Sequence, residues 1–184
     1  MRAFIAIELS DAVRQALSSL VLRLRESRAR VSWVRVENIH LTLRFLGEVD
    51  EPHIERLAGI LRDAYKGIVP FTLSVRGTGA FPNLRKPSVI WVGAGPVEGP
   101  LGEVQLAAES AARAIGLPPE EKAFHPHLTL ARIRDARGAG PLVARLEEER
   151  DFEGGEIPVN RVSLFSSELA PGGPVYTRVM EFGF

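Results

Sequence analysis

Cysteine is missing from the 184-residue sequence, and so is any long apolar segment. Without cysteine, disulfide frameworks, thiol redox chemistry and cysteine–zinc sites are excluded. No apolar run reaches the length of about 18 residues that predicts a transmembrane helix. The N-terminal segment MRAFIAIELS also lacks the apolar region and cleavage site of a signal peptide. We therefore expect a cytoplasmic protein that does not contact a membrane.

A net charge is also absent, because 23 basic side chains balance 23 acidic ones. This balance argues against a protein that coats nucleic acid in bulk, since such proteins are strongly basic. The hydrophobic fraction of 45% and the charged fraction of 25% are typical of a soluble globular domain. We expect one domain, residues 1–184, and a monomer.

The periodicity of apolar residues predicts alternating strands and helices joined by short connections. The order strand, helix, strand, helix occurs twice, with variations. We therefore predict an α+β fold with two pseudo-symmetric lobes of mainly antiparallel strands, helices packed outside, and an active site in the central cleft. The expected strands are 3–9, 31–34, 39–46, 71–81, 88–95, 127–134, 157–169 and 175–184, and the expected helices are 11–27, 50–67, 99–116 and 140–150.

The tetrapeptide HLTL occurs at 40–43 and again at 127–130, and it uses two of the four histidines. Side chains alternate across a strand, so each copy places its leucines on one face and a histidine–threonine pair on the other. If the lobes are related by a pseudo-two-fold axis, both pairs face a common groove. Two imidazoles there could transfer protons in both directions, one as base and one as acid.

The repeat is also compatible with two further interpretations. In the first, each copy is simply a half-buried strand with polar residues outward. The second is a metal site, because His125 and His127 share one strand face, but a zinc site needs more ligands than these. We expect His125 to be a loop neighbour of the site and His53 to be a surface residue.

The flanking residues extend the pattern to HLTLRFLGEV and FHPHLTLARIR, and the chain ends in SLFSSELAPGGPVYTRVMEFGF. With these motifs the sequence resembles the two-histidine phosphoesterases over nearly its whole length. The branch it is most similar to is the bacterial and archaeal RNA 2′,3′-cyclic phosphodiesterases, also called RNA 2′,5′-ligases. This resemblance implies metal-independent hydrolysis of 2′,3′-cyclic phosphates at RNA 3′ ends, or of 2′,3′-cyclic nucleotides, to a 2′-phosphate and a 3′-OH, without a cofactor.

The resemblance also implies roles for individual residues. His40 would be the general acid toward O3′, and His127 would be the general base on water. Thr42 and Thr129 would hold phosphate oxygens.

The family pattern continues to H-x-T-x-x-F and H-x-T-x-x-R, which this chain matches at Phe45 and Arg132. Phe45 would stack on the terminal base and Arg132 would bind the phosphate. Strict alternation, however, places both on the leucine face. Phe45 could therefore be a core residue, whereas Arg132 requires an irregularity in its strand.

Other residues and other functions are weaker candidates. We expect Arg85 and Lys86 to be solvated, Trp33 and Trp91 to be core residues, and Arg35 and Arg44 to be at most guides for phosphate. Two alternative functions stay open: reversible RNA 2′,5′-joining, in which an RNA hydroxyl replaces water, and a nucleotide- or RNA-binding module without turnover.

Overall fold

The computed structural model describes residues 1–184 and has an α+β architecture, as predicted. Four α-helices and a short 3-10 turn accompany a nine-stranded antiparallel sheet. The strands are β1 (Arg2–Ile7), β2 (Ser32–Trp33), β3 (Leu41–Glu48), β4 (Phe71–Phe81), β5 (Val89–Gly95), β6 (His127–Arg132), β7 (Glu153–Val159), β8 (Arg161–Ala170) and β9 (Gly173–Gly183). The helices are α1 (Asp11–Arg25), α2 (Glu51–Tyr65), α3 (Pro100–Ala114) and α4 (Gly140–Glu148), and the turn η1 is Val36–Asn38. None of the helices has the length and apolar character required to cross a membrane.

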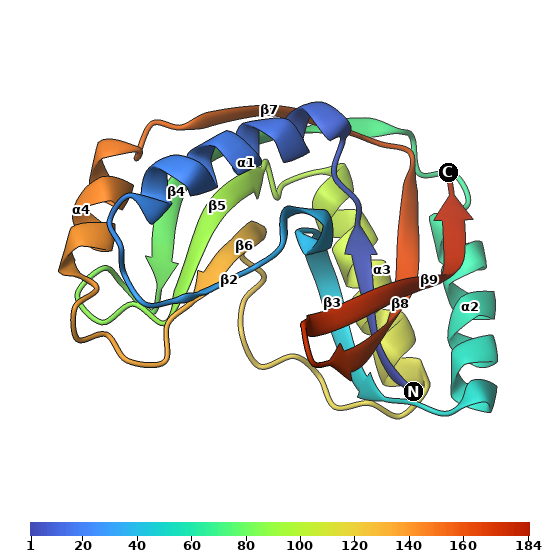
Figure 1. Ribbon diagram of the computed structural model, residues 1–184. Coiled ribbons are helices and arrows are strands. Elements are labelled where there is room, and N and C mark those ends of the chain that lie inside the picture. The colour runs from blue at the N-terminus through green and yellow to red at the C-terminus, as the bar shows by residue number, and fades with distance from the viewer.

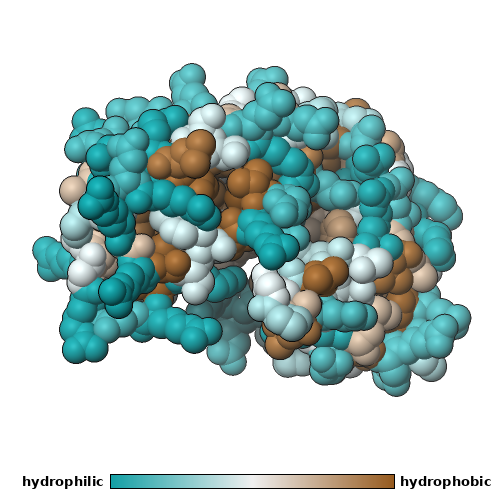
Figure 2. Space-filling view, viewed as in Figure 1, coloured by the Kyte–Doolittle hydropathy of each residue, from teal (hydrophilic) through white to brown (hydrophobic).

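The sheet runs in the order β7-β4-β5-β6-β3-β1-β8-β9, and β2 adds to β6. It divides into the two lobes visible in Figure 1. The first lobe contains β3, β1, β8 and β9 with helices α2 and α3. The second lobe contains β7, β4, β5 and β6 with helices α1 and α4. In the space-filling view the surface is hollowed between these lobes at the lower edge (Figure 2).

Two of the helices, α1 and α2, begin at a capping side chain. The hydroxyl of Ser10 accepts a hydrogen bond from the backbone N–H of Val13 at the start of α1, and Asp50 does the same for His53 at the start of α2. Each of these helices then buries one apolar stripe against the sheet or a neighbouring helix.

Helix packing interleaves the two lobes. Helix α1 follows β1, a strand of the first lobe, but it packs on β7 and α4 of the second lobe. Helix α3 follows β5, a strand of the second lobe, but it packs on β3 and α2 of the first. The two crossings are related by the same pseudo-symmetry as the HLTL repeat.

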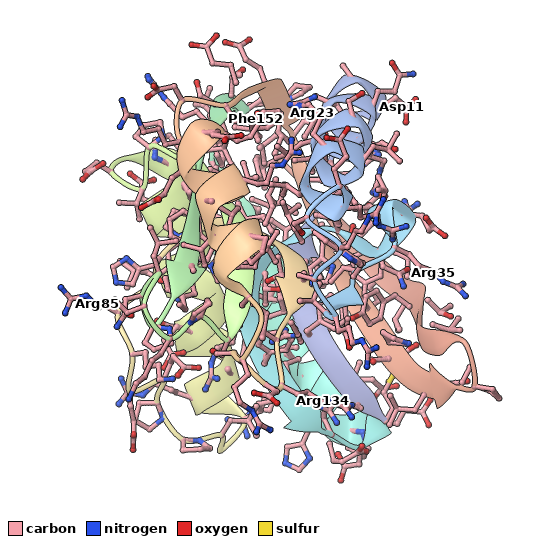
Figure 3. All side chains as sticks on the ribbon, turned by 60° about the vertical axis from the view of Figure 1, so that its left-hand side comes forward. Asp11, Arg23, Arg35, Arg85, Arg134 and Phe152 are labelled. Atoms are coloured by element: carbon pink, nitrogen blue, oxygen red, sulfur yellow. The ribbon has the colours of Figure 1, made fainter.

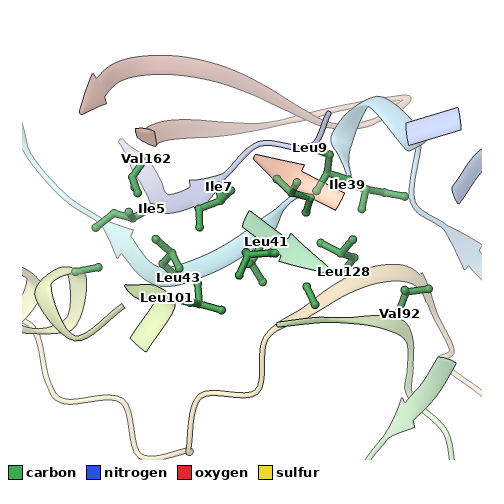
Figure 4. Packing of buried hydrophobic residues seen from close by; sticks show 14 of the residues in the cluster. Ile5, Ile7, Leu9, Ile39, Leu41, Leu43, Val92, Leu101, Leu128 and Val162 are labelled. Carbon is green, nitrogen blue, oxygen red and sulfur yellow. The ribbon is translucent and has the colours of Figure 1, made fainter. Parts of the chain in front are cut away.

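One continuous core of buried apolar side chains extends through both lobes. Strand alternation directs the HLTL leucines into it, as predicted: Leu41, Leu128 and Leu130 are fully buried and Leu43 is 4% exposed. Figure 4 shows Leu41 and Leu128 packed close together at the junction of the lobes. The leucine face therefore fixes both motifs in the core and leaves the histidine face on the other side of the sheet.

The strand predicted over 157–169 is wrong, because this segment belongs to two strands at different places in the sheet. Strand β7 ends at Val159 beside β4, and β8 begins at Arg161 beside β1. The break is visible in the burial pattern. Ile157 and Val159 are buried at odd positions, but Val162 and Leu164 are buried at even positions. The change of phase at Asn160 marks the crossing from one lobe to the other.

Candidate active site

The two HLTL motifs meet at a single ladder pair. Leu41 on β3 is the partner of Leu128 on β6, and it is the only pair that joins these two strands. The two leucines hold the same position in their motifs, so the pseudo-two-fold axis passes between them. On the antiparallel register, His40 and His127 flank this pair from opposite sides, each next to the other motif's threonine.

His40 lies in an aromatic cluster of the first lobe. Its ring stacks on Phe4 with centroids 4.6 Å apart, and it meets the ring of Tyr176 edge-on with centroids 5.4 Å apart. Its Nδ1 lies 2.8 Å from the carbonyl oxygen of Asn38. A carbonyl can only accept, so Nδ1 carries a hydrogen and donates it. Nε2 is then the nitrogen that can exchange a proton with a substrate.

His127 repeats this arrangement in the second lobe. Its Nδ1 lies 2.6 Å from the carbonyl oxygen of His125, again two residues earlier in the chain. The ring meets the ring of Phe81 edge-on, with centroids 4.9 Å apart and planes at 90°. His125 is thus a neighbour that orients the site, as expected. Both histidines are held in the same tautomer by the same local contact, which keeps Nε2 available in each.

Burial lowers the pKa of both imidazoles below the usual 6.5. Desolvation lowers the pKa of His40 to about 4, against the effect of its bond to Asn38, and the positive charges of Arg14 and Arg132 add to the lowering. Desolvation is also the main cause of the lowered pKa of His127, and Arg132 contributes again. One arginine therefore acts on both rings, and burial favours the neutral form of each in the free protein.

A repeated β-bulge explains how Phe45 and Arg132 return to the histidine face. In the pairing of β3 with β1, Leu43 has no partner residue. In the pairing of β6 with β5, Leu130 has none. Both of these leucines are the fourth residue of their HLTL motif. Each bulge shifts the alternation by one residue. The irregularity that Arg132 requires is therefore present, and the same one occurs before Phe45.

The bulge leaves Phe45 outside the core. Its side chain is 56% exposed, and its ring lies 5.9 Å from Phe4, which stacks on His40. Arg132 is exposed on the second lobe, at a position whose charge acts on both histidines. Thr42 and Thr129 are half-buried on the histidine face. The structure thus brings together all six residues that the sequence singled out.

A cavity of about 480 Å³ opens beside His127 on the second lobe. The expectation that Trp91 is a core residue is wrong: its half-buried indole lines this cavity together with Phe81. Trp33, by contrast, packs against the core as expected. A smaller cavity of about 260 Å³ lies beside His40 and is lined in part by Phe4 and Tyr176.

Sequence reasoning did not find Phe4, Phe81 or Tyr176 as neighbours of the site. A signal existed for Phe4, since the segment AFIAI is apolar at consecutive positions. Such a run indicates a strand covered on both faces, so the face opposite Ile5 had to be covered as well. No comparable signal existed for Phe81 and Tyr176, whose positions depend on how distant strands pair.

Arg44 does not guide phosphate. It is only 8% exposed, its Nε lies 2.6 Å from an oxygen of Glu109, and it donates to the carbonyl oxygen of Pro118. It therefore ties β3 to α3 and to the segment after α3. Arg35 and Arg85 extend from the surface (Figure 3).

Lys86 and His53 are also exposed surface residues, and His53 pairs with Asp50 at the start of α2. No group of three or more histidine, aspartate and glutamate side chains in residues 1–184 is arranged to hold a metal ion. His125 and His127 have no third donor beside them.

The family model described as LigT like Phosphoesterase matches residues 7–91 and 92–176, one copy for each half of the chain. The RNA 2′,3′-cyclic phosphodiesterase of Methanothermobacter thermautotrophicus is 36% identical over 184 residues, covering 99% of this chain and 98% of the relative. The enzyme of the same name from Aeropyrum pernix is 40% identical over 167 residues, covering 86% of this chain and 92% of the relative.

Solved structures agree with these sequence relatives. The Thermus thermophilus protein TT0787 superposes with a TM-score of 0.81 at 32% identity, covering 100% of this chain and 97% of that one. Escherichia coli LigT complexed with 3′-AMP gives a TM-score of 0.72 at 26% identity, with the same coverage. The two-part match of the family model also agrees with the two HLTL motifs and their shared bulge. This chain is therefore a member of the LigT-like phosphoesterase family.

Proposed function

We propose that the protein hydrolyses RNA 2′,3′-cyclic phosphate ends to a 2′-phosphate and a 3′-OH, without a metal ion. The observation that carries this proposal is the matched pair His40 and His127, each with Nδ1 bound to the carbonyl two residues earlier and Nε2 available. The relatives whose sequences match over most of their length bear the name of this activity.

In the proposed reaction His127 accepts a proton from water as the water oxygen bonds to phosphorus. The P–O3′ bond breaks, and His40 donates its proton to O3′. Arg132 and the hydroxyls of Thr42 and Thr129 would donate hydrogen bonds to the phosphate oxygens, where negative charge accumulates. Phe45, exposed beside Phe4, would offer its face to the terminal base.

The lowered pKa values suit the two roles unequally. A neutral His127 is ready to act as base. His40 must be protonated to act as acid, although burial in the free protein lowers its pKa to about 4. An anionic cyclic phosphate beside the ring favours the imidazolium form and raises this pKa. We therefore propose that His40 takes up its proton when the substrate binds.

The test is to incubate the purified protein, in the presence of EDTA, with an oligoribonucleotide that ends in a 2′,3′-cyclic phosphate. The expected product carries a 2′-phosphate and a free 3′-OH. His40→Ala and His127→Ala should each lower the rate by about 10²- to 10⁴-fold while the circular dichroism spectrum is kept. Full activity in either variant, or activity that is lost with EDTA and restored by zinc, would contradict the proposal. A joined strand as the main product would indicate 2′,5′-joining, and bound but unchanged substrate would indicate a binding module.

A further inference from the structure

Arg76, Gly93 and His127 form one row across three neighbouring strands of the second lobe. The register pairs Arg76 on β4 with Gly93 on β5, and Gly93 with His127 on β6. Directly paired residues point to the same face of a sheet. Strands lie about 4.8 Å apart, so the backbones of Arg76 and His127 are about 10 Å apart with only a glycine between them.

This row crosses the cavity of about 480 Å³ described above, whose size is within the range of small-molecule sites. Gly93 and Gly95 line the cavity without side chains to fill it. A Cβ atom at Gly93 would lie 2.8 Å from the carbonyl oxygen of Arg76, which shows how closely the backbones approach there. Phe81 and Trp91, with ring centroids 5.2 Å apart, form an aromatic wall.

The guanidinium of Arg76 makes no ion pair in the protein. Arg76 on β4 is paired in the sheet with the exposed Glu153 on β7. The guanidinium and the carboxylate are nevertheless more than 4.0 Å apart and form no ion pair. Arg76 is thus a cation that lines a cavity, is paired with no carboxylate, and stands in one row with His127. A phosphate group is the natural ligand for such a guanidinium, since it can accept two parallel hydrogen bonds.

The corresponding cavity beside His40 differs in its charges. Arg14 there donates to the carbonyl oxygens of Val36 and Glu37, and Arg178 pairs with Glu8 and Glu181. Its arginines are therefore already occupied by protein groups, and its volume is only about 260 Å³. The two lobes are alike in fold, but only the second offers an arginine free to bind an anion beside its histidine.

The orientation of a bound RNA end follows from the proposed function, on which this step rests. With the cyclic phosphate between the histidines and the terminal base on Phe45, the base lies over the first lobe. In a ribose ring C1′, which carries the base, and C4′, which carries C5′, lie on opposite sides of the ring oxygen. C5′ and the phosphate attached to it then point toward the second lobe, where Arg76 stands.

We propose that the cavity lined by Arg76, Phe81 and Trp91 is a subsite for the nucleotide that precedes the cyclic-phosphate end. Arg76 binds the phosphodiester that joins the last two nucleotides, and the aromatic wall contacts the preceding base. The preferred substrate is therefore the end of an RNA chain rather than a free nucleoside 2′,3′-cyclic phosphate.

The experiment compares kcat/KM for a dinucleotide that ends in a 2′,3′-cyclic phosphate with kcat/KM for the corresponding nucleoside 2′,3′-cyclic phosphate. The wild-type protein should favour the dinucleotide by at least about tenfold, and Arg76→Gln should reduce this ratio roughly tenfold. Arg76→Lys keeps the charge but not the paired donors, and should retain part of the preference. For the dinucleotide, the slope of log kcat/KM against log salt should become shallower by about 0.7 in Arg76→Gln, the value for one phosphate contact.

Arg113→Gln is the matched control, because it removes one exposed arginine from the outer helix α3. It should keep the wild-type ratio. Equal ratios in Arg76→Gln and the wild type, or an equal fall in the control, would overturn the subsite. A wild-type ratio of one, with both substrates hydrolysed, would overturn the subsite but leave the proposed function standing. If the wild type hydrolysed neither substrate, the proposed function would fail first.

Discussion

The ring of Phe4 lies stacked on the imidazole of His40, with centroids 4.6 Å apart and planes inclined by 24°. Phe4 is almost fully buried and comes from β1, the strand next to His40 in the sheet. This contact excludes water from one face of the imidazole. It is therefore a direct cause of the desolvation that lowers the pKa of His40 to about 4.

Replacement of Phe4 should raise the pKa of His40. In Phe4→Ala water can reach the ring, so we expect the pKa to move from about 4 toward 6.5. Phe4→Leu keeps an apolar side chain of similar reach and should give a smaller rise. The measurement is an NMR titration of the imidazole C–H signals. A folded Phe4→Ala protein in which this pKa stayed near 4 would contradict the assigned cause.

The same shift makes the stability of the protein depend on pH. In the unfolded chain His40 binds a proton below about 6.5, but in the folded protein only below about 4. The unfolded state binds more protons between these values, so the free energy of unfolding falls as the pH falls through this window. With about 1.4 kcal/mol for each pKa unit, the loss amounts to roughly 3 kcal/mol.

The check is urea unfolding of the wild type and of His40→Gln at several pH values from 7 to 4. The difference between the two proteins isolates this histidine from the other titrating groups. We expect the wild type to lose about 3 kcal/mol more than the variant over this range. Parallel curves for the two proteins would show that His40 is not buried in its neutral form.

Arg132 should affect both histidines and the reaction. Its positive charge lowers the pKa of each imidazole, so in Arg132→Gln both pKa values should rise. If Arg132 donates the proposed hydrogen bonds to the phosphate, their loss should reduce kcat by about 10²-fold or more. Arg132→Lys keeps the charge, and should therefore keep the low pKa values while it recovers only part of the rate. NMR titration and steady-state kinetics on the same samples test both effects, and Arg132→Gln with unchanged kcat would exclude the phosphate role.

The ion pair between Arg44 and Glu109 gives a prediction about stability alone. Both side chains are largely buried, at 8% and 17% exposed, and their nearest atoms are 2.6 Å apart. Arg44→Met leaves the carboxylate buried without its partner and should cost about 3–5 kcal/mol. Arg44→Met combined with Glu109→Leu removes both charges and should cost less than the single change. Urea unfolding of the three proteins tests this, and additive losses would show that the two side chains are not coupled.

The sequence predicted the fold class, the four helices and the position of both histidines, because these depend on local periodicity and on an exact repeat. It could not decide the face of Phe45, because the bulge that turns it outward is defined by pairing with β1, far away in the chain. The repeat nevertheless indicated this bulge, because Arg132 at the equivalent position could not be buried without a partner. Applying that requirement to both copies predicts the bulge in each.

Sequence reasoning could not place residues whose roles depend on contacts between segments far apart in the chain. Trp91 was expected in the core because a tryptophan in an apolar strand usually packs inside. It lines the cavity instead, since its strand face carries Gly93 and Gly95, which leave that face uncovered. The burial of Arg44 on β3 was missed because its partner Glu109 lies on α3, a helix that follows β5 in the chain.

The exchange of α1 and α3 between the lobes limits how the molecule can be divided. The family model separates the halves after residue 91, but the first helix of each half covers elements of the other half. A fragment that ends there would expose the apolar stripe of its helix and the uncovered face of its own strands. Neither piece could become a stable monomer by itself. Two such pieces, either the two different halves or two copies of one half, could cover each other's exposed surfaces by exchanging helices. A half-length chain with this architecture would therefore be stable only as a dimer.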